Sequence, residues 1–143
     1  MKLSAKAEYA CLAVLELALR HDRPEPARLV EVAGPNGIPE RFLVQILLQL
    51  KGAGFVSSVR GAAGGYRLAL EPRDISVWDI VQTVEGPIAA PVAEHETNTT
   101  AGWHVLRHVW QETNRLEQEH LEQIDFSQLS DLARAQNSNM YYI

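Results

Sequence analysis

Apolar residues recur at intervals of three and four along most of the chain, which is the spacing of one face of a helix. Ser4 and Ser76 precede two of these segments and can cap the first helical turn. Asp79 follows Ser76 by three residues, the spacing of a capping box. The pattern predicts a mainly α-helical protein with helices over residues 4–20, 27–33, 39–51, 76–85, 103–123 and 128–133.

Two features between residues 34 and 70 predict a more specific fold. Residues 34–37 (GPNG) predict a tight turn between the second and third helices, and Pro39 suits a first helical position. A short helix, a turn and a second helix indicate a helix-turn-helix, although helical hairpins unrelated to DNA share this pattern. Residues 55–59 and 65–70 then predict two strands around a glycine-rich loop, which is typical of a wing.

The long segment 103–123 carries more apolar surface than one small domain can cover. We therefore expect it to be a dimerisation helix. The predicted organisation is a winged helix-turn-helix DNA-binding domain at 1–85, a loop at 86–102, the dimerisation helix with a short C-terminal helix at 103–136, and a tail at 137–143. The apolar positions of the long helix are Trp103, Leu106, Val109, Trp110, Thr113, Leu116 and Leu121.

Composition narrows the class of protein. The chain has 143 residues, of which 46% are hydrophobic and 22% charged, which are values of a globular protein. It has neither an apolar run long enough to span a membrane nor a signal-peptide pattern, so we expect a cytoplasmic protein. Its single cysteine, Cys11, lies in an apolar segment and is expected to be a small buried side chain rather than a redox switch. Without a nucleophile–base pair, phosphate loop or paired carboxylates in a recognisable context, an enzyme is not expected.

The net charge of −5 argues at first against a nucleic-acid partner. However, residues 1–84 contain ten Lys and Arg against nine Asp and Glu, whereas residues 85–143 contain three against nine. Residues 41–70 contain four basic residues and no acidic one. This segment is a candidate anion-binding surface, with an ordinary solvated patch as the alternative.

Several segments carry a resemblance to a known family. They are the opening Met1-Lys2-Leu3-Ser4 with Tyr9-Ala10, residues 37–43 (GIPERFL) with 45–47 (QIL), the hairpin residues 54–61 (GFVSSVRG) with 64–68 (GGYRL), and residues 75–81 (ISVWDIV). On these motifs the chain resembles the Rrf-two family of bacterial winged helix-turn-helix regulators, which includes the IscR, NsrR and CymR types. The resemblance covers residues 1–86 closely and the long helix more loosely.

The resemblance implies a homodimeric transcription factor, usually a repressor, that binds double-stranded DNA at a pseudo-palindromic operator. It makes the helix that begins at Pro39 the recognition helix, the hairpin a DNA-contacting wing and the N-terminus a phosphate contact. The DNA-binding residues implied are Lys2, Arg41, Phe42, Gln45, Lys51, Ser57, Arg60, Gly61, Gly64 and Gly65.

Two departures from the family pattern concern readout and sensing. Many relatives carry glutamate where this chain has Val44, so readout is expected to shift to a thymine methyl group or to lose a base contact. The resemblance also makes residues 86–102 a sensor-type loop, where cluster-binding relatives carry three cysteines and this chain has none. Glu8 matches an acidic cluster ligand of some relatives, but without thiolates we expect no cofactor. The effector is then a small molecule or a partner protein, since CymR-type relatives respond through a partner enzyme.

A metal site of another kind is the remaining alternative for sensing. His104, His108 and Glu112 lie four residues apart on one helix face, and His95 lies among acidic residues of the preceding loop. Such spacing also occurs by chance on exposed helices, so solvated or interface histidines are the favoured interpretation. A winged-helix module that binds proteins, without an operator of its own, is the alternative to DNA binding.

Overall fold

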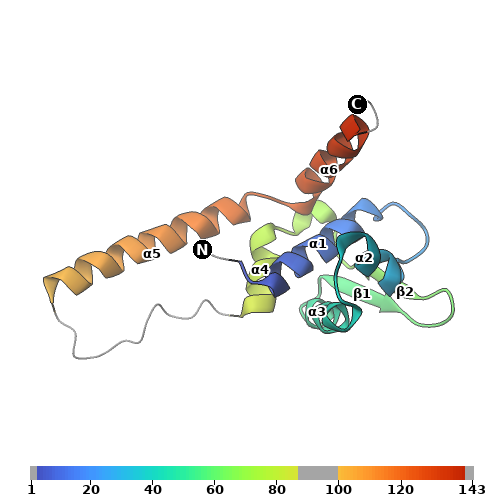
Figure 1. The fold of residues 1–143 in the computed structure, drawn as a ribbon, viewed down its shortest axis with the longest axis horizontal. Coiled ribbons are helices and arrows are strands. Elements are labelled where there is room, and N and C mark those ends of the chain that lie inside the picture. Colours follow the sequence, from blue (N-terminus) through green and yellow to red (C-terminus); the bar gives the residue numbers. More distant parts are fainter. Residues whose placement is uncertain (1–2, 87–99, 141–143) are drawn as a thin grey trace.

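The computed structural model describes residues 3–86 and 100–140. Within these residues it shows a mainly helical fold with one antiparallel hairpin, as the sequence predicts (Figure 1). The elements are α1 (Ala5–Leu19), α2 (Leu29–Asn36), α3 (Glu40–Gly52), β1 (Val56–Val59), β2 (Gly65–Leu68), the 3-10 turn η1 (Pro72–Asp74), α4 (Val77–Glu85), α5 (Ala101–Glu122) and α6 (Phe126–Met140).

The hydrophobic core forms around α1, which contacts α2, α3, α4 and α6. Ala7, Ala10 and Ala13 are fully buried on its inner faces, and such small side chains let neighbouring helices approach closely. The recognition-type helix α3 supplies a fully enclosed face at spacings of three and four residues. That face consists of Leu43, Ile46, Leu47 and Leu50.

The predicted helix starts are confirmed by their capping hydrogen bonds. The Ser4 hydroxyl accepts from the backbone N–H of Ala7 at 3.1 Å. At α4 the Ser76 hydroxyl accepts from the N–H of Asp79 at 3.1 Å, while the Ser76 N–H donates to the Asp79 carboxylate at 2.9 Å. This reciprocal pair is the capping box that the Ser–Asp spacing predicts.

The boundaries predicted for α2 are wrong at both ends. Ala27 is not helical, because its backbone exchanges hydrogen bonds with Tyr66 of β2 at 2.9 and 2.7 Å. At the other end the helix continues through Pro35 to Asn36, where a tight turn is predicted. The turn is made instead by Gly37 alone, in the left-handed conformation that glycine adopts without strain (φ 63°).

The hairpin is anchored to the connection between α1 and α2. Besides the Ala27–Tyr66 pair, the Arg67 guanidinium donates to the backbone carbonyls of Arg23 and Pro24. Its strands pair from Val56 opposite Leu68 to Val59 opposite Gly65. The wing is therefore fixed at its base while its tip, at residues 60–63, is exposed.

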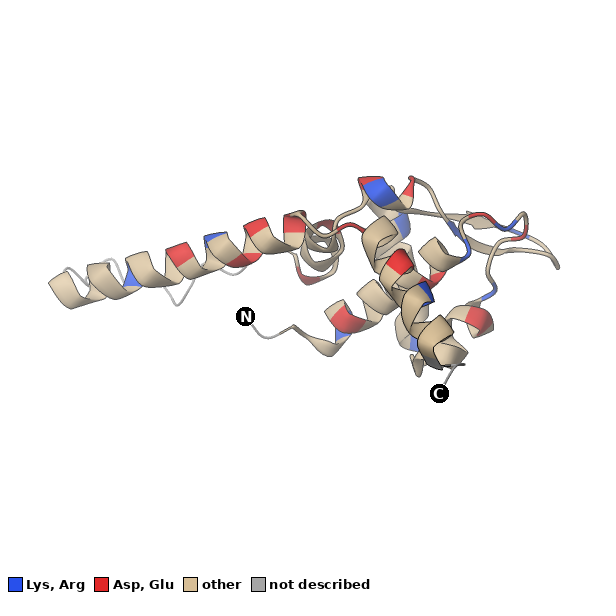
Figure 2. Cartoon of the chain, turned by 90° about the horizontal axis from the view of Figure 1, so that it is seen from above, with Lys and Arg blue, Asp and Glu red and all other residues tan. Residues whose placement is uncertain are grey.

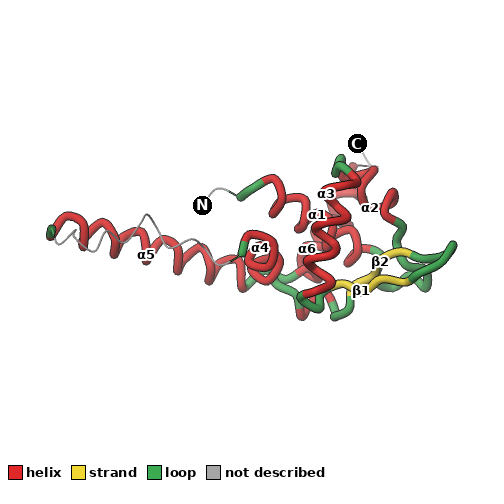
Figure 3. The backbone as a smooth tube through the Cα atoms, turned by 90° about the horizontal axis from the view of Figure 1, so that it is seen from below, coloured by secondary structure: helices red, strands yellow, loops and turns green. Residues whose placement is uncertain are grey.

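Helix α5 projects away from the rest of the chain, on the side opposite the hairpin (Figures 1 and 3). It contacts α4 near its C-terminal end, and none of its residues is buried. Within residues 3–86 and 100–140, no helix is both long and apolar enough to cross a membrane.

The chain returns from α5 to the core through α6. Val77 and Phe126 donate backbone hydrogen bonds to Ile124 and Ile75 across this junction, at 2.8 and 3.0 Å. Phe126 is fully buried in the core that α1 and α3 build, so the core does not end at residue 85. Helix α6 runs from Phe126 to Met140, whereas a short helix at 128–133 and a tail from 137 are predicted. Once its first turn is buried, the helix continues through polar, exposed residues.

Candidate nucleic-acid interface

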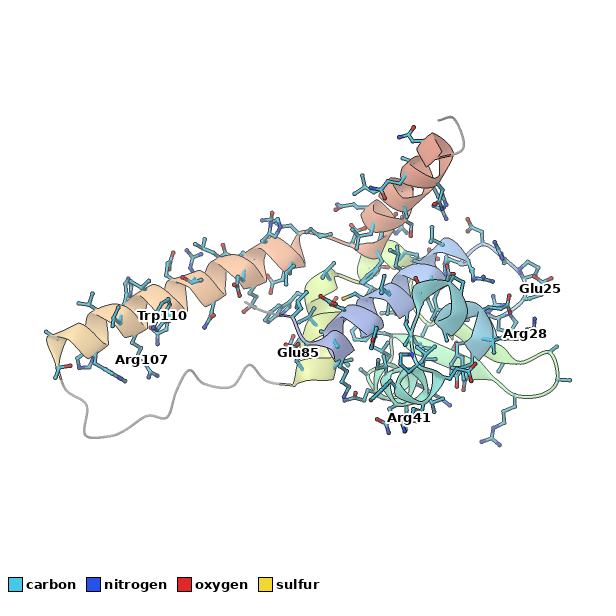
Figure 4. The ribbon with its side chains drawn as sticks, viewed as in Figure 1. Glu25, Arg28, Arg41, Glu85, Arg107 and Trp110 are labelled. Atoms are coloured by element: carbon cyan, nitrogen blue, oxygen red, sulfur yellow. The ribbon has the colours of Figure 1, made fainter. Side chains whose placement is uncertain are left out.

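The outer side of α3 displays most of the predicted DNA-binding residues. Arg41, Phe42, Gln45 and Lys51 are all exposed, while the opposite side of the helix is buried. The Arg41 guanidinium carbon lies 5.5 Å from the centre of the Phe42 ring. Figure 4 shows Arg41 at the outer edge of α3. The helix therefore offers its outer side to a ligand with one cation near its start and another at Lys51.

The C-terminal end of α3 is linked to the wing. Lys51 donates from Nζ to the hydroxyl of Ser58 in β1 at 2.7 Å. The predicted contact residue Ser57 is half-buried in the same strand, opposite Arg67 of β2. The Lys51–Ser58 bond places the recognition-type helix and the hairpin on one continuous surface.

The wing glycines have different structural roles. Gly61 has a φ of 108°, which non-glycine residues rarely adopt. Gly64 and Gly65 have ordinary φ values, but a Cβ atom on either would lie 2.2 Å from the Val59 carbonyl oxygen or 2.3 Å from that of Ala27, respectively. Gly61 therefore serves the turn, whereas Gly64 and Gly65 are required because neighbouring backbone atoms lie too close for a side chain.

Two predicted contact residues remain, Arg60 in the wing and Lys2 at the N-terminus. Arg60 is exposed where β1 ends. Lys2 lies outside the described residues.

Lys6, which is not among the predicted contact residues, is exposed on α1 beside α3. It helps to line a cavity of about 320 Å³ together with Ala5, Tyr9, Phe42, Gln45 and Ile46. Its position near the family-like opening segment is the signal that could have identified it.

A second group of cations lies on the far side of the wing. Arg20, Arg23 and Arg28 border a cavity of about 380 Å³ that the wing-tip residues Ala62 and Ala63 help to close. Glu31 offsets part of this charge, since it pairs with Arg20 at 3.0 Å and with Arg28 at 3.1 Å. The backbone N–H and guanidinium of Arg28 lower the pKa of Glu31. Figure 4 shows Arg28 beside the hairpin. Because Glu31 pairs with both Arg20 and Arg28, this edge is less strongly cationic than its three arginines suggest.

Helix α3 begins with the exposed carboxylate of Glu40, but residues 41–70, which form the rest of α3 and the wing, contain no carboxylate. Carboxylates are numerous on α5 instead, which lies at the opposite end of the molecule (Figure 2). The acidic side chains of α5 are Glu112, Glu117, Glu119 and Glu122. The segment without carboxylates at 41–70 and the acidic helix α5 are therefore separated in space, which favours binding of a polyanion at α3 and the wing.

The donor atoms for an iron or iron–sulfur site do not fit. The chain has one cysteine, so one chain cannot supply three thiolate ligands. Cys11, expected to be buried, is only partly buried against the core. Its removal from water, reinforced by the carboxylates of Glu8 and Glu85, raises the pKa of the thiol to about 11, which disfavours the thiolate that binds metal. Glu8 is exposed on α1.

The histidine alternative gains no support from the described residues. Glu112 is engaged by the guanidinium of Arg115, and His104 packs edge-on against Trp103 with ring centres 4.9 Å apart. Within residues 3–86 and 100–140, no group of three His, Cys, Asp or Glu side chains is arranged to hold a metal ion. His95 lies outside the described residues.

Comparison with known sequences adds the family. The model of the Rrf2 family, described as an iron-dependent transcriptional regulator, matches residues 3–132. An rrf2-like HTH-type transcriptional regulator of Rhodobacter capsulatus is 46% identical over 89 residues, which cover 61% of this chain and 59% of that protein. The HTH-type transcriptional regulator CymR of Bacillus subtilis is 37% identical over an alignment that covers both chains completely. The match thus spans less than two thirds of the Rhodobacter protein.

Solved structures show the same fold. The structure of T. potens IscR is similar with a TM-score of 0.76 and 34% identity, over 93% of this chain and 88% of that one. The structure of B. subtilis CymR, described as the global cysteine regulator, has a TM-score of 0.79 and 33% identity, over 92% and 98%. These similarities confirm the winged helix-turn-helix prediction. The relatives are transcriptional regulators rather than enzymes, as the sequence predicts.

Proposed function

The chain belongs to the Rrf2 family of HTH-type transcriptional regulators, and from this premise we propose that it is a dimeric, sequence-specific DNA-binding repressor. It acts in the cytoplasm, the compartment of its DNA partner. It works without a three-cysteine iron–sulfur cluster, because the chain carries one cysteine. Its signal is a small molecule or a partner protein.

One observation carries the DNA-binding part of the proposal: from Arg41 onward, α3 and the wing form a single surface joined by the Lys51–Ser58 bond, and residues 41–70 of this surface carry no carboxylate. Arg41 lies at one end of this surface and Arg60 at the wing. Cations spaced in this way can neutralise phosphates on both sides of a major groove that receives the helix. We assign Lys2, Phe42, Gln45 and the wing residues Ser57, Gly61, Gly64 and Gly65 to the same contact surface.

The homodimer is supported by the exposed apolar face of α5, which no other described element covers. Leu106, Val109, Trp110 and Leu116 are 46–56% exposed and recur on one side of the helix. An exposed apolar stripe of this length marks an association surface. Pairing α5 with its copy covers the stripe of both chains and directs the two winged-helix units outward.

The pseudo-palindromic operator follows from that dimer. Two identical recognition helices related by a two-fold axis contact two inverted half-sites, and the spacing of the half-sites matches the helical repeat of DNA. Repression is the mode that such a dimer achieves simply by occupying a promoter.

The proposal is tested by gel shift with promoter DNA of the chain's own gene. We expect retarded complexes whose affinity falls steeply with salt, and a loss of about tenfold for Arg60→Ala. Leu132→Ala, an exposed residue of α6, is the matched control and leaves binding unchanged. Absence of binding at low salt would contradict the proposal and favour a protein-interaction module instead.

A further inference from the structure

The recognition-type helix α3 exposes large apolar side chains on the side that faces away from the core. Val44 is 45% exposed and Leu48 is 69% exposed, although the same helix buries four other apolar residues completely. Val44 and Leu48 are one helical turn apart and form a continuous apolar strip. Single exposed apolar residues are ordinary. Two adjacent ones on the surface assigned to DNA indicate contact with an apolar group of the ligand.

The strip lies between two cations on one face of the helix. Arg41 precedes Val44 by three residues, so the two side chains are neighbours. Lys51 follows Leu48 by three residues and is bonded to Ser58 of the wing. The face therefore presents the Arg41 cation, two apolar side chains and the Lys51 cation in order. The exposed carboxylate of Glu40 lies at its N-terminal end, one turn before Val44. Phe42, in contrast, lines the cavity beside α1 and is not part of the strip.

This order matches what a duplex displays when a helix enters its major groove. Phosphates lie at the groove edges, and the C5-methyl group of thymine is the apolar contact that a base presents inside the groove. Val44 and Leu48 carry no hydrogen-bonding group that could recognise guanine or cytosine. Gln45, next to Val44 on the exposed side, can donate to and accept from adenine, the partner of thymine.

We propose that Val44 and Leu48 recognise thymine methyl groups in each half-site of the operator, so that this chain selects A·T pairs at the centre of its recognition-helix contact. The inference rests on the proposed function and specifies what its reading surface recognises. After Glu40, the first residue of α3, residues 41–70 carry no further carboxylate that would repel a polyanion from the strip.

The experiment uses the full chain and a random duplex library. Sequences enriched by binding are synthesised with single thymines replaced by uracil, which removes only the 5-methyl group and keeps every hydrogen bond. We expect an affinity loss of about fourfold at one or two thymines of each half-site, the value of one lost apolar contact of methyl size.

A double variant assigns the effect to the strip. In Val44→Ala/Leu48→Ala the uracil effect disappears, whereas in the control Leu132→Ala it remains. If uracil changes nothing at any position of an enriched sequence, or if its effect persists in the double variant, the thymine-methyl assignment is wrong while DNA recognition stands. If no sequence is enriched at all, the proposed function itself fails.

Discussion

Two parts of the molecule use apolar residues in opposite ways. In the winged-helix core, formed by α1–α4, the hairpin and the first turn of α6, side chains such as Leu43, Leu50 and Phe126 are completely enclosed. In α5, a helix of 22 residues, nothing is buried although the apolar spacing is equally regular. Periodicity alone therefore predicts a helix and its apolar face, but not whether the face is covered by the same chain.

The difference also separates stability from assembly. Removing apolar surface from the winged-helix core leaves a cavity among close-packed neighbours. Removing it from α5 alters only an exposed surface, which a second copy covers in the proposed dimer. Substitutions in the two parts should therefore change different measurements.

The largest effect is expected for Phe126→Ala. This side chain joins α6 to the core, and its loss should lower the free energy of unfolding by about 3–5 kcal/mol, the usual cost of a large aromatic cavity. Chemical denaturation at one fixed protein concentration measures it. Leu132→Ala on the same helix, 63% exposed, should change stability by less than about 0.5 kcal/mol. If Phe126→Ala lowered the free energy of unfolding as little as Leu132→Ala, the first turn of α6 would not be part of the core.

The next effect concerns α5. Trp110→Asp places a charge in the apolar stripe and should weaken self-association by about a hundredfold while the circular dichroism spectrum is retained. Sedimentation over a concentration series measures the dissociation constant. Gln111→Asp introduces the same charge on the other side of the helix and should leave association nearly unchanged. An equal effect of both substitutions would argue against the stripe as the dimer surface.

Gly65→Ala tests how firmly the wing is anchored. A Cβ atom there would lie 2.3 Å from the Ala27 carbonyl oxygen, so we expect a loss of about 1–3 kcal/mol from forced displacement of the hairpin. Gly52→Ala is the matched control, since no atom lies within 4 Å of its added Cβ and the residue is helical. It should stabilise the chain by about 0.5–1 kcal/mol. Thermal melting distinguishes the two signs, and stabilisation by Gly65→Ala would refute the anchoring.

The last prediction concerns the reactivity of Cys11, whose replacement or modification is expected to matter least for stability and assembly. Its pKa of about 11 keeps the thiol protonated at pH 8, and the reactive thiolate becomes abundant only as pH rises toward 11. A disulfide reagent should therefore modify the native chain far more slowly at pH 8 than the chain in urea. Equal rates would show that Cys11 is available as a redox switch after all.

Much of the fold could be predicted because its determinants are local. The Ser76–Asp79 capping box, the strong apolar spacing of α3 and the glycine-rich hairpin each act within a few residues. The misjudged boundaries have distant causes. Ala27 leaves the helix because Tyr66, far along the chain, occupies its hydrogen bonds. Helix α6 is longer than predicted because its start is held by the core rather than by its own polar sequence.

The candidate site was predictable in kind but not in detail. Charge and family motifs predict contacts for Arg41, Gln45, Lys51 and Arg60, and all four side chains are exposed. The packing roles of Gly64 and Gly65 depend on backbone atoms that only the folded hairpin brings near. The bond from Lys51 to Ser58 depends likewise on the approach of α3 to the wing.

The most direct test of a dimeric, sequence-specific regulator is the symmetry of the DNA that the full chain selects from a random duplex library. We predict an enriched sequence with two inverted half-sites, about one helical turn or a multiple of it apart. Enrichment of a single half-site, or of no sequence at all, would contradict the account.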